Sequence, residues 1–378
     1  MFYDVFVFAG EKSADLHGEK LLQALYAQNP HLKIAGVGGP RMRAVGMHCI
    51  LPMEEFQVMG FIDVFLALPK LLRQFYFVAR EIQRLNPKAV VTIDYPGFNL
   101  RMAKHLKKKG FQGKLVHFIC PSVWAWGKKR IPLMAKNLDL LISILPFEKQ
   151  LFADTSLQVA FVGHPLAERL KTYGYQECFV PSGKKLVALF PGSRRKEIER
   201  NLRLQLDACR ELLEKNSDFH IALSVSDEKF LPPMKEILKE KGWNENEISL
   251  VPISQSYELM KAAYLAIAKS GTVTLELAMH RVPTVVVYGV SKLDKIIAYD
   301  ILRIRLPFYC LVNIIAQKEV FPELIGPHFT LQNLKEKVES LLKEPNRIKI
   351  QSECDAVIKQ LGQKETSQEA AAEILKMI

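Results

Sequence analysis

The chain has 378 residues, more than one hydrophobic core usually supports, so two domains are expected. An apolar content of 49% and a charged content of 24% exclude a wholly disordered chain. The 52 lysines and arginines outnumber the 40 acidic residues, and the net charge of +12 suits nucleic acid, an anionic membrane surface or a phosphorylated substrate. Charge alone does not choose among these partners.

The beginning of the chain and its cysteines indicate a reducing compartment. No basic segment precedes the first apolar run, which leads directly into Gly10 and Glu11, so we interpret it as a strand and not as a signal peptide. The six cysteines show no Cys-x-x-Cys spacing. This distribution argues against a disulfide framework or a zinc site and favours the cytoplasm.

The first half of the chain alternates short β-rich runs with helical patterns. The β-rich runs span 3–9, 32–37, 88–93, 114–120, 138–145 and 159–162. Such alternation predicts βαβ units around a parallel sheet. Residues 174–185 then form a polar stretch with Pro181 and Gly183, which we interpret as an interdomain linker.

Residues 58–79 form the most apolar long stretch of the first half. Asp63, Pro69, Lys70 and Arg73 interrupt it well short of the ~20 apolar residues that a spanning helix needs. Apolar residues precede basic ones within it, as in a helix that lies in a membrane interface. A buried helix of the first domain explains the same pattern, and the sequence leaves both possibilities open.

The second half repeats the α/β pattern. Its β-rich runs span 185–190, 219–225, 248–251, 264–268 and 283–288, and residues 331–378 are helical in period. We therefore expect an α/β protein with two Rossmann-like domains, at 1–173 and 184–345. The helices at 346–378 are expected to pack on either domain or on a partner subunit.

Two small turns in the second half are candidate diphosphate sites. Pro191-Gly192-Ser193-Arg194 follows the run at 185–190, and Ser270-Gly271-Thr272 follows the run at 264–268. Backbone N–H groups at such strand ends, together with Arg194, suit a phosphate, and Glu276 suits ribose hydroxyls. Plain helix caps with a solvated arginine and a surface glutamate explain the same residues.

Several nucleotide-binding fingerprints are absent from the sequence. Neither turn matches Gly-x-Gly-x-x-Gly or the P-loop pattern, which disfavours a redox dinucleotide or a P-loop nucleotide. The chain also has no Asp-x-Asp to hold a metal ion on a diphosphate. Arginine and helix N-termini would have to stabilise a leaving diphosphate instead.

Polar residues at strand ends of the first half are candidate acceptor contacts. Asp94 ends a β-branched run and suits a general base, although an Asp that caps the helix starting near Pro96 is the simpler interpretation. Glu11, Ser13 and Asp15 follow the first strand as caps, acceptor contacts or both. Trp124 stands near Lys128 and suits a sugar ring beside a phosphate, although tryptophans are more often core.

Taken together, these motifs resemble the lipid-A-disaccharide synthase family from about residue 5 to about residue 330. Six of the segments that carry the resemblance begin, in chain order, at Gly10, Ile93, Pro121, Gly163, Pro191 and Ser270. Asn313 and Pro322-Glu323-Leu324 follow them further along the chain. As a set they are highly specific. One departure is that Lys12 and Ala14 stand where the family usually has Ala and Gly, which affects the expected shape of the first loop.

The resemblance implies an inverting glycosyltransferase of the GT-B type that needs no metal or other cofactor, with its two Rossmann-like domains facing a cleft. Such an enzyme joins UDP-2,3-diacylglucosamine to 2,3-diacylglucosamine 1-phosphate and releases UDP and lipid A disaccharide 1-phosphate, in lipopolysaccharide biosynthesis of Gram-negative bacteria. It works in the cytoplasm as a peripheral protein of the anionic inner membrane, without nucleic acid, and a homodimer is left open.

The resemblance also implies roles for individual residues. Asp94 becomes the base for the acceptor 6-hydroxyl. The residues expected to bind UDP and the donor side are Gly192, Ser193, Arg194, Ser270, Gly271, Thr272, Glu276 and Asn313. The acceptor side is assigned to Glu11, Ser13, Asp15, Ser122 and Trp124. Membrane or acyl-chain contact is expected at Phe61, Val64 and Leu68.

Two rival functions remain from the residues. A UDP-N-acetylglucosamine epimerase has the same architecture but needs no lipid acceptor. A catalytically silent lipid- or nucleotide-binding protein is the other rival, for which Lys12 and Ala14 are the only hint.

Overall fold

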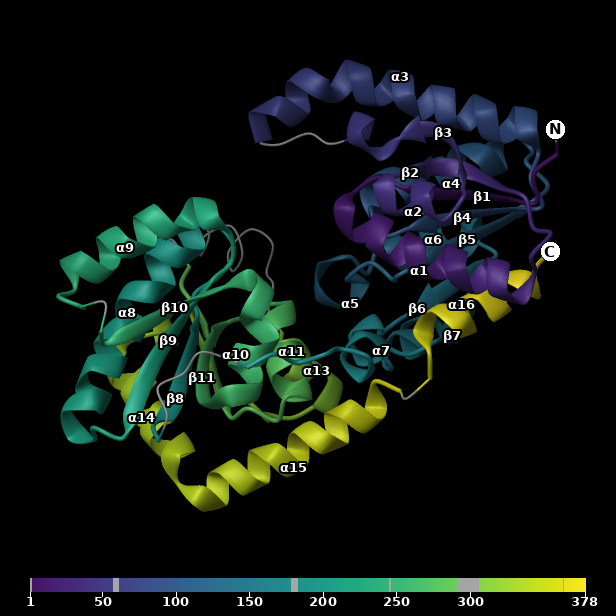
Figure 1. The fold of residues 1–378 in the computed structure, drawn as a ribbon. Helices are drawn as coiled ribbons and strands as arrows, with labels where there is room; N and C mark the ends of the chain where they lie inside the picture. The colour runs from purple at the N-terminus through teal and green to yellow at the C-terminus, as the bar shows by residue number, and fades with distance from the viewer. Residues whose placement is uncertain (1, 57–60, 178–182, 245, 291–305, 363) are drawn as a thin grey trace. The chain divides into compact units, whose positions relative to one another are not determined.

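A computed structural model describes residues 2–56, 61–177, 183–244, 246–290, 306–362 and 364–378, with the backbone alone for 61–68 and 126. The chain divides into two compact units. Unit 1 comprises residues 1–169 and 361–378, and unit 2 comprises residues 170–360. Figure 1 labels the elements of both units. Across the described residues, no helix combines the length and the apolar character that a membrane crossing requires.

Unit 1 is built on a parallel sheet of seven strands among its described residues, in the order β3-β2-β1-β4-β5-β6-β7. The strands are β1 (Val5–Ala9), β2 (Ile34–Gly38), β3 (His48–Pro52), β4 (Ala89–Ile93), β5 (Lys114–Phe118), β6 (Leu140–Ser143) and β7 (Gln158–Phe161). β1 and β4 are buried along their whole length, as their apolar composition requires of central strands.

Helices cover both faces of this sheet (Figure 1). The helices of unit 1 are α1 (Lys12–Gln28), α2 (Pro40–Ala44), α3 (Phe61–Leu85), α4 (Pro96–Lys108), α5 (Val123–Trp126), α6 (Arg130–Asn137) and α16 (Thr366–Leu375), and α7 (Pro165–Lys171) runs across the boundary into unit 2. One apolar cluster joins the sheet to α3, α4 and α6, and the other joins it to α1, α2 and α16. Successive side chains of β1 point to opposite faces of the sheet, so Phe6 and Phe8 pack in the first cluster and Val5 and Val7 in the second.

The described half of α3 packs on the sheet by one face only. Val78, Ala79 and Ile82 are buried in the first cluster, whereas Leu72 and Tyr76 remain exposed by 49% and 56%. The sequence left a buried helix and an interfacial helix open, and this half of α3 has the features of both. The side chains of Phe61, Val64 and Leu68 lie outside the described residues.

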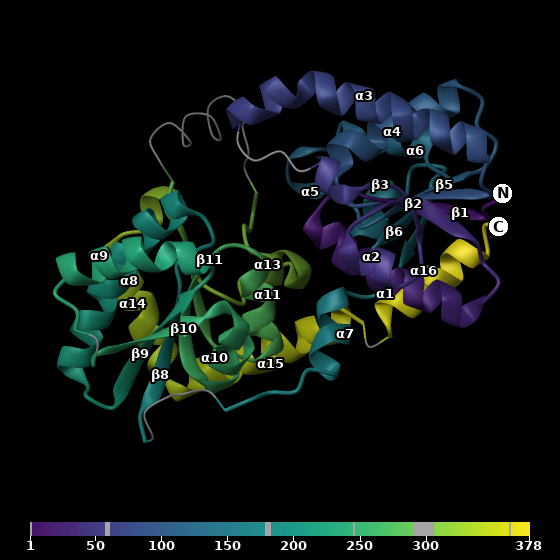
Figure 2. The same cartoon turned by 45° about the horizontal axis from the view of Figure 1, so that its top comes forward.

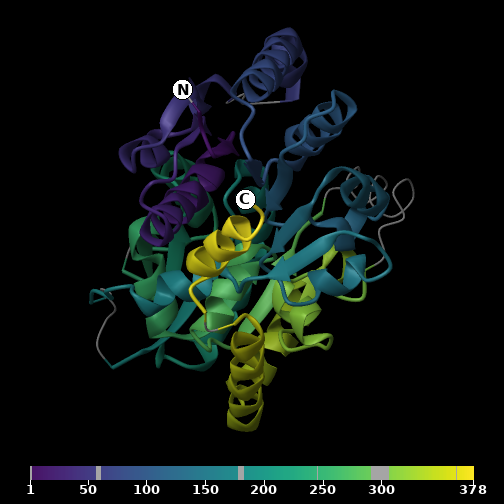
Figure 3. The same ribbon diagram turned by 90° about the vertical axis from the view of Figure 1, so that its right-hand side faces the viewer.

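The last helix, α16, belongs to unit 1 although it follows all of unit 2 in the sequence. Ala370, Ala371 and Ile374 are fully buried in the same cluster as α1. Gln28 of α1 donates a hydrogen bond to the Gln368 carbonyl at 2.9 Å. Figure 3 shows α16, in yellow, beside the purple α1. The helices at 346–378 were expected from sequence to form one group, but residues up to 360 belong to unit 2 and α16 belongs to unit 1.

Unit 2 contains a second parallel sheet, of six strands among the described residues, in the order β10-β9-β8-β11-β12-β13. The strands are β8 (Lys185–Phe190), β9 (Phe219–Val225), β10 (Ile248–Pro252), β11 (Ala263–Lys269), β12 (Thr284–Tyr288) and β13 (Glu323–Ile325). Both units are therefore Rossmann-like, as the sequence predicted.

The helices of unit 2 also lie on both faces of its sheet (Figure 2). They are α8 (Arg195–Lys215), α9 (Leu231–Glu240), α10 (Ser256–Ala262), α11 (Thr272–Met279), α13 (Leu311–Ala316), α14 (Leu331–Leu342) and α15 (Glu344–Gln360). α10 and α11 close one apolar cluster, and α8, α9 and α14 pack together on the other face. Arg347 fixes α15 by stacking on Tyr264, 3.4 Å from the ring centroid.

In both sheets the strand order reverses beside the first strand of the unit. The reversal lies between β1 and β4 in unit 1 and between β8 and β11 in unit 2. Ligands of open α/β sheets bind at the carboxyl ends of the strands at such a switch point. The segments after these four strands are therefore the places to look for a site, and they begin with Gly10, Asp94, Pro191 and Ser270.

Candidate functional site

Asp94, directly after β4, has an unusual backbone conformation. The backbone φ angles of Asp94 and Tyr95 are both +48°. This is the left-handed region, which residues other than glycine rarely adopt. The Asp94 N–H donates to the Phe118 carbonyl at 2.9 Å, and the Asn99 side chain donates to the Asp94 carbonyl at 2.6 Å. These bonds hold the strained turn, which carries the Asp94 side chain past the strand end.

The Asp94 carboxyl group faces Glu11, which follows β1 across the switch point. Burial, the negative charge of Glu11 and a hydrogen bond that protonated Asp94 donates to Glu11 raise the pKa of Asp94 to about 6. Glu11 also accepts a hydrogen bond from the Ser13 hydroxyl at 2.9 Å. A carboxyl group with a pKa near 6 is suited to general-base catalysis close to neutral pH.

Asp94 lies one residue before the N-cap of α4 and is not the N-cap itself. α4 begins at Pro96 with Tyr95 as its N-cap, and the Tyr95 side chain makes no capping hydrogen bond, while the Asp94 carboxylate accepts a hydrogen bond from the Tyr95 backbone N–H. Asp15, in contrast, is a cap. Its carboxylate is only 2% exposed and accepts hydrogen bonds from the backbone N–H groups of Gly39, at 2.8 Å, and of two residues in α2.

Ser122 and Trp124 lie after β5, at the same edge of the sheet. Ser122 is exposed as the N-cap of α5. Trp124 is half-buried, with its ring edge-on to Phe147 at 5.8 Å, and its Nε1 is buried without a hydrogen-bond partner. Glu148 lies one residue beyond Phe147. Burial raises the pKa of Glu148 to about 8, so this carboxyl group is protonated and neutral at pH 7.

In unit 2, the turn after β8 is organised by a buried glutamate, Glu197. Its carboxylate accepts hydrogen bonds from the Ser193 N–H and the Arg194 guanidinium, both at 3.2 Å, and pairs with Lys269 of β11 at 3.3 Å. Gly192 has φ +133°, and a Cβ atom there would lie 2.8 Å from Glu197. Glycine is therefore required at this position.

The second turn begins where β11 ends. The Ser270 hydroxyl donates to the Tyr309 carbonyl at 3.1 Å, and Gly271 is the N-cap of α11, which begins with the exposed Thr272. Glu276, one turn along α11, accepts a hydrogen bond from the Tyr257 hydroxyl at 3.2 Å. The strand order brings this turn beside the turn at Arg194, because β8 and β11 are neighbours.

Asn313 is fully buried and holds the backbone that leads into β13. Its Oδ1 accepts from the N–H groups of Val320 and Phe321, both at 2.9 Å, and its Nδ2 donates to Phe321 and Glu323. Glu323 in turn accepts from the Tyr309 N–H at 2.9 Å. Asn313 therefore supports the segment that contacts Ser270.

Comparison with known proteins identifies the family. A family model described as lipid-A-disaccharide synthetase matches residues 5–377. The chain belongs to the lipid-A-disaccharide synthetase family. Relatives named lipid-A-disaccharide synthase include those of Chlamydia pneumoniae, 38% identical over 99% of this chain, and of Chlamydia trachomatis serovar D, 40% identical over 85%. A relative of that name from Gluconobacter oxydans is 36% identical over 92% of this chain.

The relatives differ in length from this chain. It spans 62% of the Chlamydia pneumoniae protein, 53% of the Chlamydia trachomatis protein and 83% of the Gluconobacter oxydans protein.

Solved structures share the fold at low sequence identity. The UDP-GlcNAc 2-epimerase from Neisseria meningitidis bound to UDP-GlcNAc superposes with a TM-score of 0.60 at 12% identity, over 99% of both chains. The calicheamicin glycosyltransferase gives 0.60 at 15% identity, over 100% of this chain and 98% of that one. These similarities concern the fold alone.

Each unit of this family member thus brings together some of the residues predicted within it. Glu11, Ser13 and Asp94 meet in unit 1, and the two small turns are adjacent in unit 2. Asp15 and Asn313 are buried in supporting roles. Sequence reasoning missed Glu197 and Lys269, although Glu197 stands three residues after Arg194, a spacing that allows contact on a helix.

Proposed function

We propose that this chain is an inverting glycosyltransferase that joins UDP-2,3-diacylglucosamine to 2,3-diacylglucosamine 1-phosphate and releases UDP and lipid A disaccharide 1-phosphate. The observation that carries the proposal is the Asp94–Glu11 pair at the switch point of unit 1, in a chain whose family is lipid-A-disaccharide synthetase. Such a pair can supply the base that the transfer needs.

On the acceptor side, Asp94 removes the proton of the acceptor 6-hydroxyl. The hydroxyl oxygen then bonds to C1 of the donor sugar on the face opposite UDP. The bond between C1 and the diphosphate oxygen breaks, its electron pair leaves with UDP, and the configuration at C1 inverts. Glu11 and Ser13 position Asp94, and Ser122 and Trp124 contact the acceptor.

On the donor side, the two turns of unit 2 bind UDP. Arg194, with Lys269 beside it, meets the negative charge that develops on the diphosphate, together with backbone N–H groups at Ser193 and Thr272. Glu276 binds the ribose hydroxyls. Because the sequence lacks Asp-x-Asp, we propose that these groups act without a metal ion.

The protein would meet its acylated substrates at the anionic surface of the inner membrane, from the cytoplasm. The exposed Leu72 and Tyr76 of α3, with the neighbouring Lys70 and Arg73, support such a contact. An exposed apolar patch flanked by basic side chains suits an anionic lipid surface. Phe61, Val64 and Leu68 precede this patch on the same helix.

The test is UDP release measured with and without the lipid acceptor, followed by mass spectrometry of the product. We expect UDP release only when 2,3-diacylglucosamine 1-phosphate is present, and a product with the mass of the disaccharide 1-phosphate. An epimerase would isomerise its UDP-sugar without acceptor. Binding of both substrates without UDP release would identify a silent binding protein, and either result would refute the proposal.

A further inference from the structure

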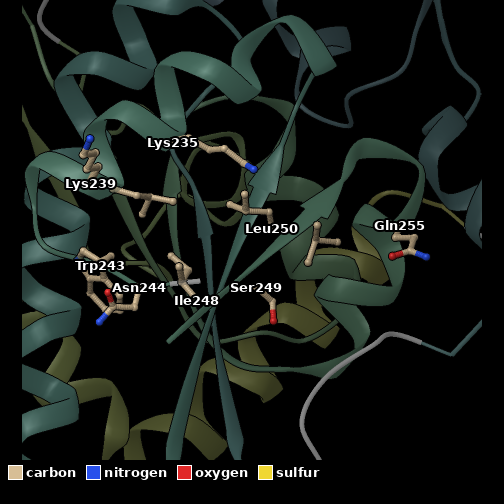
Figure 4. A pocket seen from close by; sticks show the side chains of 10 residues that line it. Lys235, Lys239, Trp243, Asn244, Ile248, Ser249, Leu250 and Gln255 are labelled. Atoms are coloured by element: carbon tan, nitrogen blue, oxygen red, sulfur yellow. The ribbon is translucent and has the colours of Figure 1, made fainter. Parts of the chain in front are cut away.

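A cavity lies in unit 2, between α9 and the edge strand β10. Its volume is about 430 Å³, within the range of about 300 to 1,000 Å³ that ligand pockets usually have. Figure 4 shows the residues around it, and those that carry the argument are Lys235, Leu238, Lys239, Trp243, Ile248 and Leu250.

This cavity is separate from the candidate UDP site. β10 is at the edge of the sheet, and β9 stands between it and β8, whose end carries the turn at Arg194. None of the described lining residues belongs to the turns after β8 and β11. The proposed glycosyltransferase reaction therefore makes no use of this cavity.

One wall of the cavity is apolar and held in place. Ile248 and Leu250 lie two residues apart on β10 and so point to the same side, while Leu238 and Trp243 are buried beside them. Arg210 stacks on the Trp243 ring, 4.1 Å from its centroid, and pairs with Glu247 at 2.8 Å. The wall is therefore already formed without a ligand.

The rim of the cavity is basic. Lys235 and Lys239 are exposed and one helical turn apart on α9, and Lys235 extends toward Leu250 (Figure 4). On the same helix Glu240 pairs with Arg203 of α8, and the exposed Glu236 adds to the negative electrostatic potential at that arginine. None of the described lining residues carries a carboxylate.

We propose that this cavity binds a single-chain amphipathic anion. Its alkyl chain lies along Leu238, Ile248 and Leu250, and its carboxylate or phosphate is bound by Lys235 and Lys239. An alternative role for lysines near an edge strand is to prevent aggregation, but such lysines lie on the strand itself. Lys235 and Lys239 lie on α9, across the cavity from β10. An inorganic anion would leave the apolar wall unused.

The experiment uses 11-bromoundecanoate, whose bromine quenches a nearby indole, with the full chain below the micelle concentration of the probe. We expect saturable quenching of tryptophan fluorescence that is lost in Trp243→Phe, with 1:1 stoichiometry by calorimetry. Replacing both Lys235 and Lys239 with Met should weaken binding about tenfold or more. The matched control replaces Lys349 and Lys359 of α15 with Met and should bind as the wild type does.

Further ligands test the head group and the chain separately. Displacement of the probe by dodecanoate, by dodecyl phosphate or by both supports the proposal and tells which head group is preferred, while inorganic phosphate should not displace it. The proposal is overturned if the wild type shows no saturable binding, if 11-bromoundecanol binds equally well, or if the two double variants bind alike. None of these results depends on glycosyltransferase activity.

Discussion

The Glu197 carboxylate accepts a hydrogen bond from the backbone N–H of Ser193, 3.2 Å away, at the turn where a phosphate is proposed to bind. The same carboxylate contacts Arg194 and Lys269. Three donors of a candidate anion site thus converge on one buried glutamate. This arrangement holds two cations near the turn and keeps the donors in place when the site is empty.

Replacing Arg194 with Ala is expected to weaken UDP binding about tenfold to a hundredfold, because a charge-assisted hydrogen bond is lost. Calorimetry with UDP measures this effect. Arg195→Ala is the matched control, since Arg195 is also exposed and pairs with Glu199 of its own helix at 2.8 Å. Equal UDP affinity for both variants would remove Arg194 from the donor site.

Replacing Asp94 with Asn is expected to reduce turnover by at least ~10²-fold while UDP affinity stays unchanged, as for the loss of a general base. Acceptor-dependent UDP release and UDP calorimetry together test this prediction. Asp154→Asn, at an exposed carboxylate of the same unit, should leave turnover unchanged. A folded Asp94→Asn protein with near-normal turnover would exclude Asp94 as the base.

The pH dependence of turnover should follow Asp94. Only the deprotonated carboxylate accepts a proton, so kcat/KM should rise with pH up to about 6 and then level off. Glu11→Gln removes a negative charge that raises this pKa, so its profile should shift to lower pH. Burial should still hold the pKa above the ordinary value. A profile unchanged by Glu11→Gln would contradict the coupling.

Glu148 should make unfolding stability depend on pH. Its pKa is about 8 in the folded chain and near 4.5 when unfolded, so between these values the folded state binds more protons. Stability therefore falls as pH rises through this window, by at most about 1.4 kcal/mol per pH unit. Glu148→Gln should reduce this slope and be the more stable form at pH 8.

Thermal unfolding at several pH values between 5 and 8 tests the Glu148 prediction. Glu214→Gln is the control, because Glu214 is exposed and its replacement should leave the slope as in the wild type. A constant difference in Tm between Glu148→Gln and the wild type would show that Glu148 does not titrate in this range.

Sequence patterns were sufficient for the central strands of both sheets. The predicted runs at 185–190 and 219–225 coincide with β8 and β9, which are apolar because helices cover both faces. Two edge strands were missed. β3 is only half-buried and mixed in composition, and β13 has three residues, so neither forms an apolar run.

The site was predictable only in part. A turn after a strand can be seen in sequence, and Asp94 and Arg194 were named as candidates in this way. A cap was one of the roles expected for Asp15, but the partners of Asp15 and Asn313 could not be predicted, because the backbone N–H groups that each binds become neighbours only in the folded chain. Glu197 was missed although Ser193 and Arg194, two of its partners, are close in sequence, and only its third partner, Lys269, is distant.

The placement of α16 has a consequence for synthesis of the protein on the ribosome. Domains generally fold as units while the chain emerges, the N-terminal one first. Here Ala370, Ala371 and Ile374 belong to the core of unit 1 but are translated after all of unit 2. During synthesis, the first unit therefore cannot bury this part of its core until the last residues of the chain have been translated.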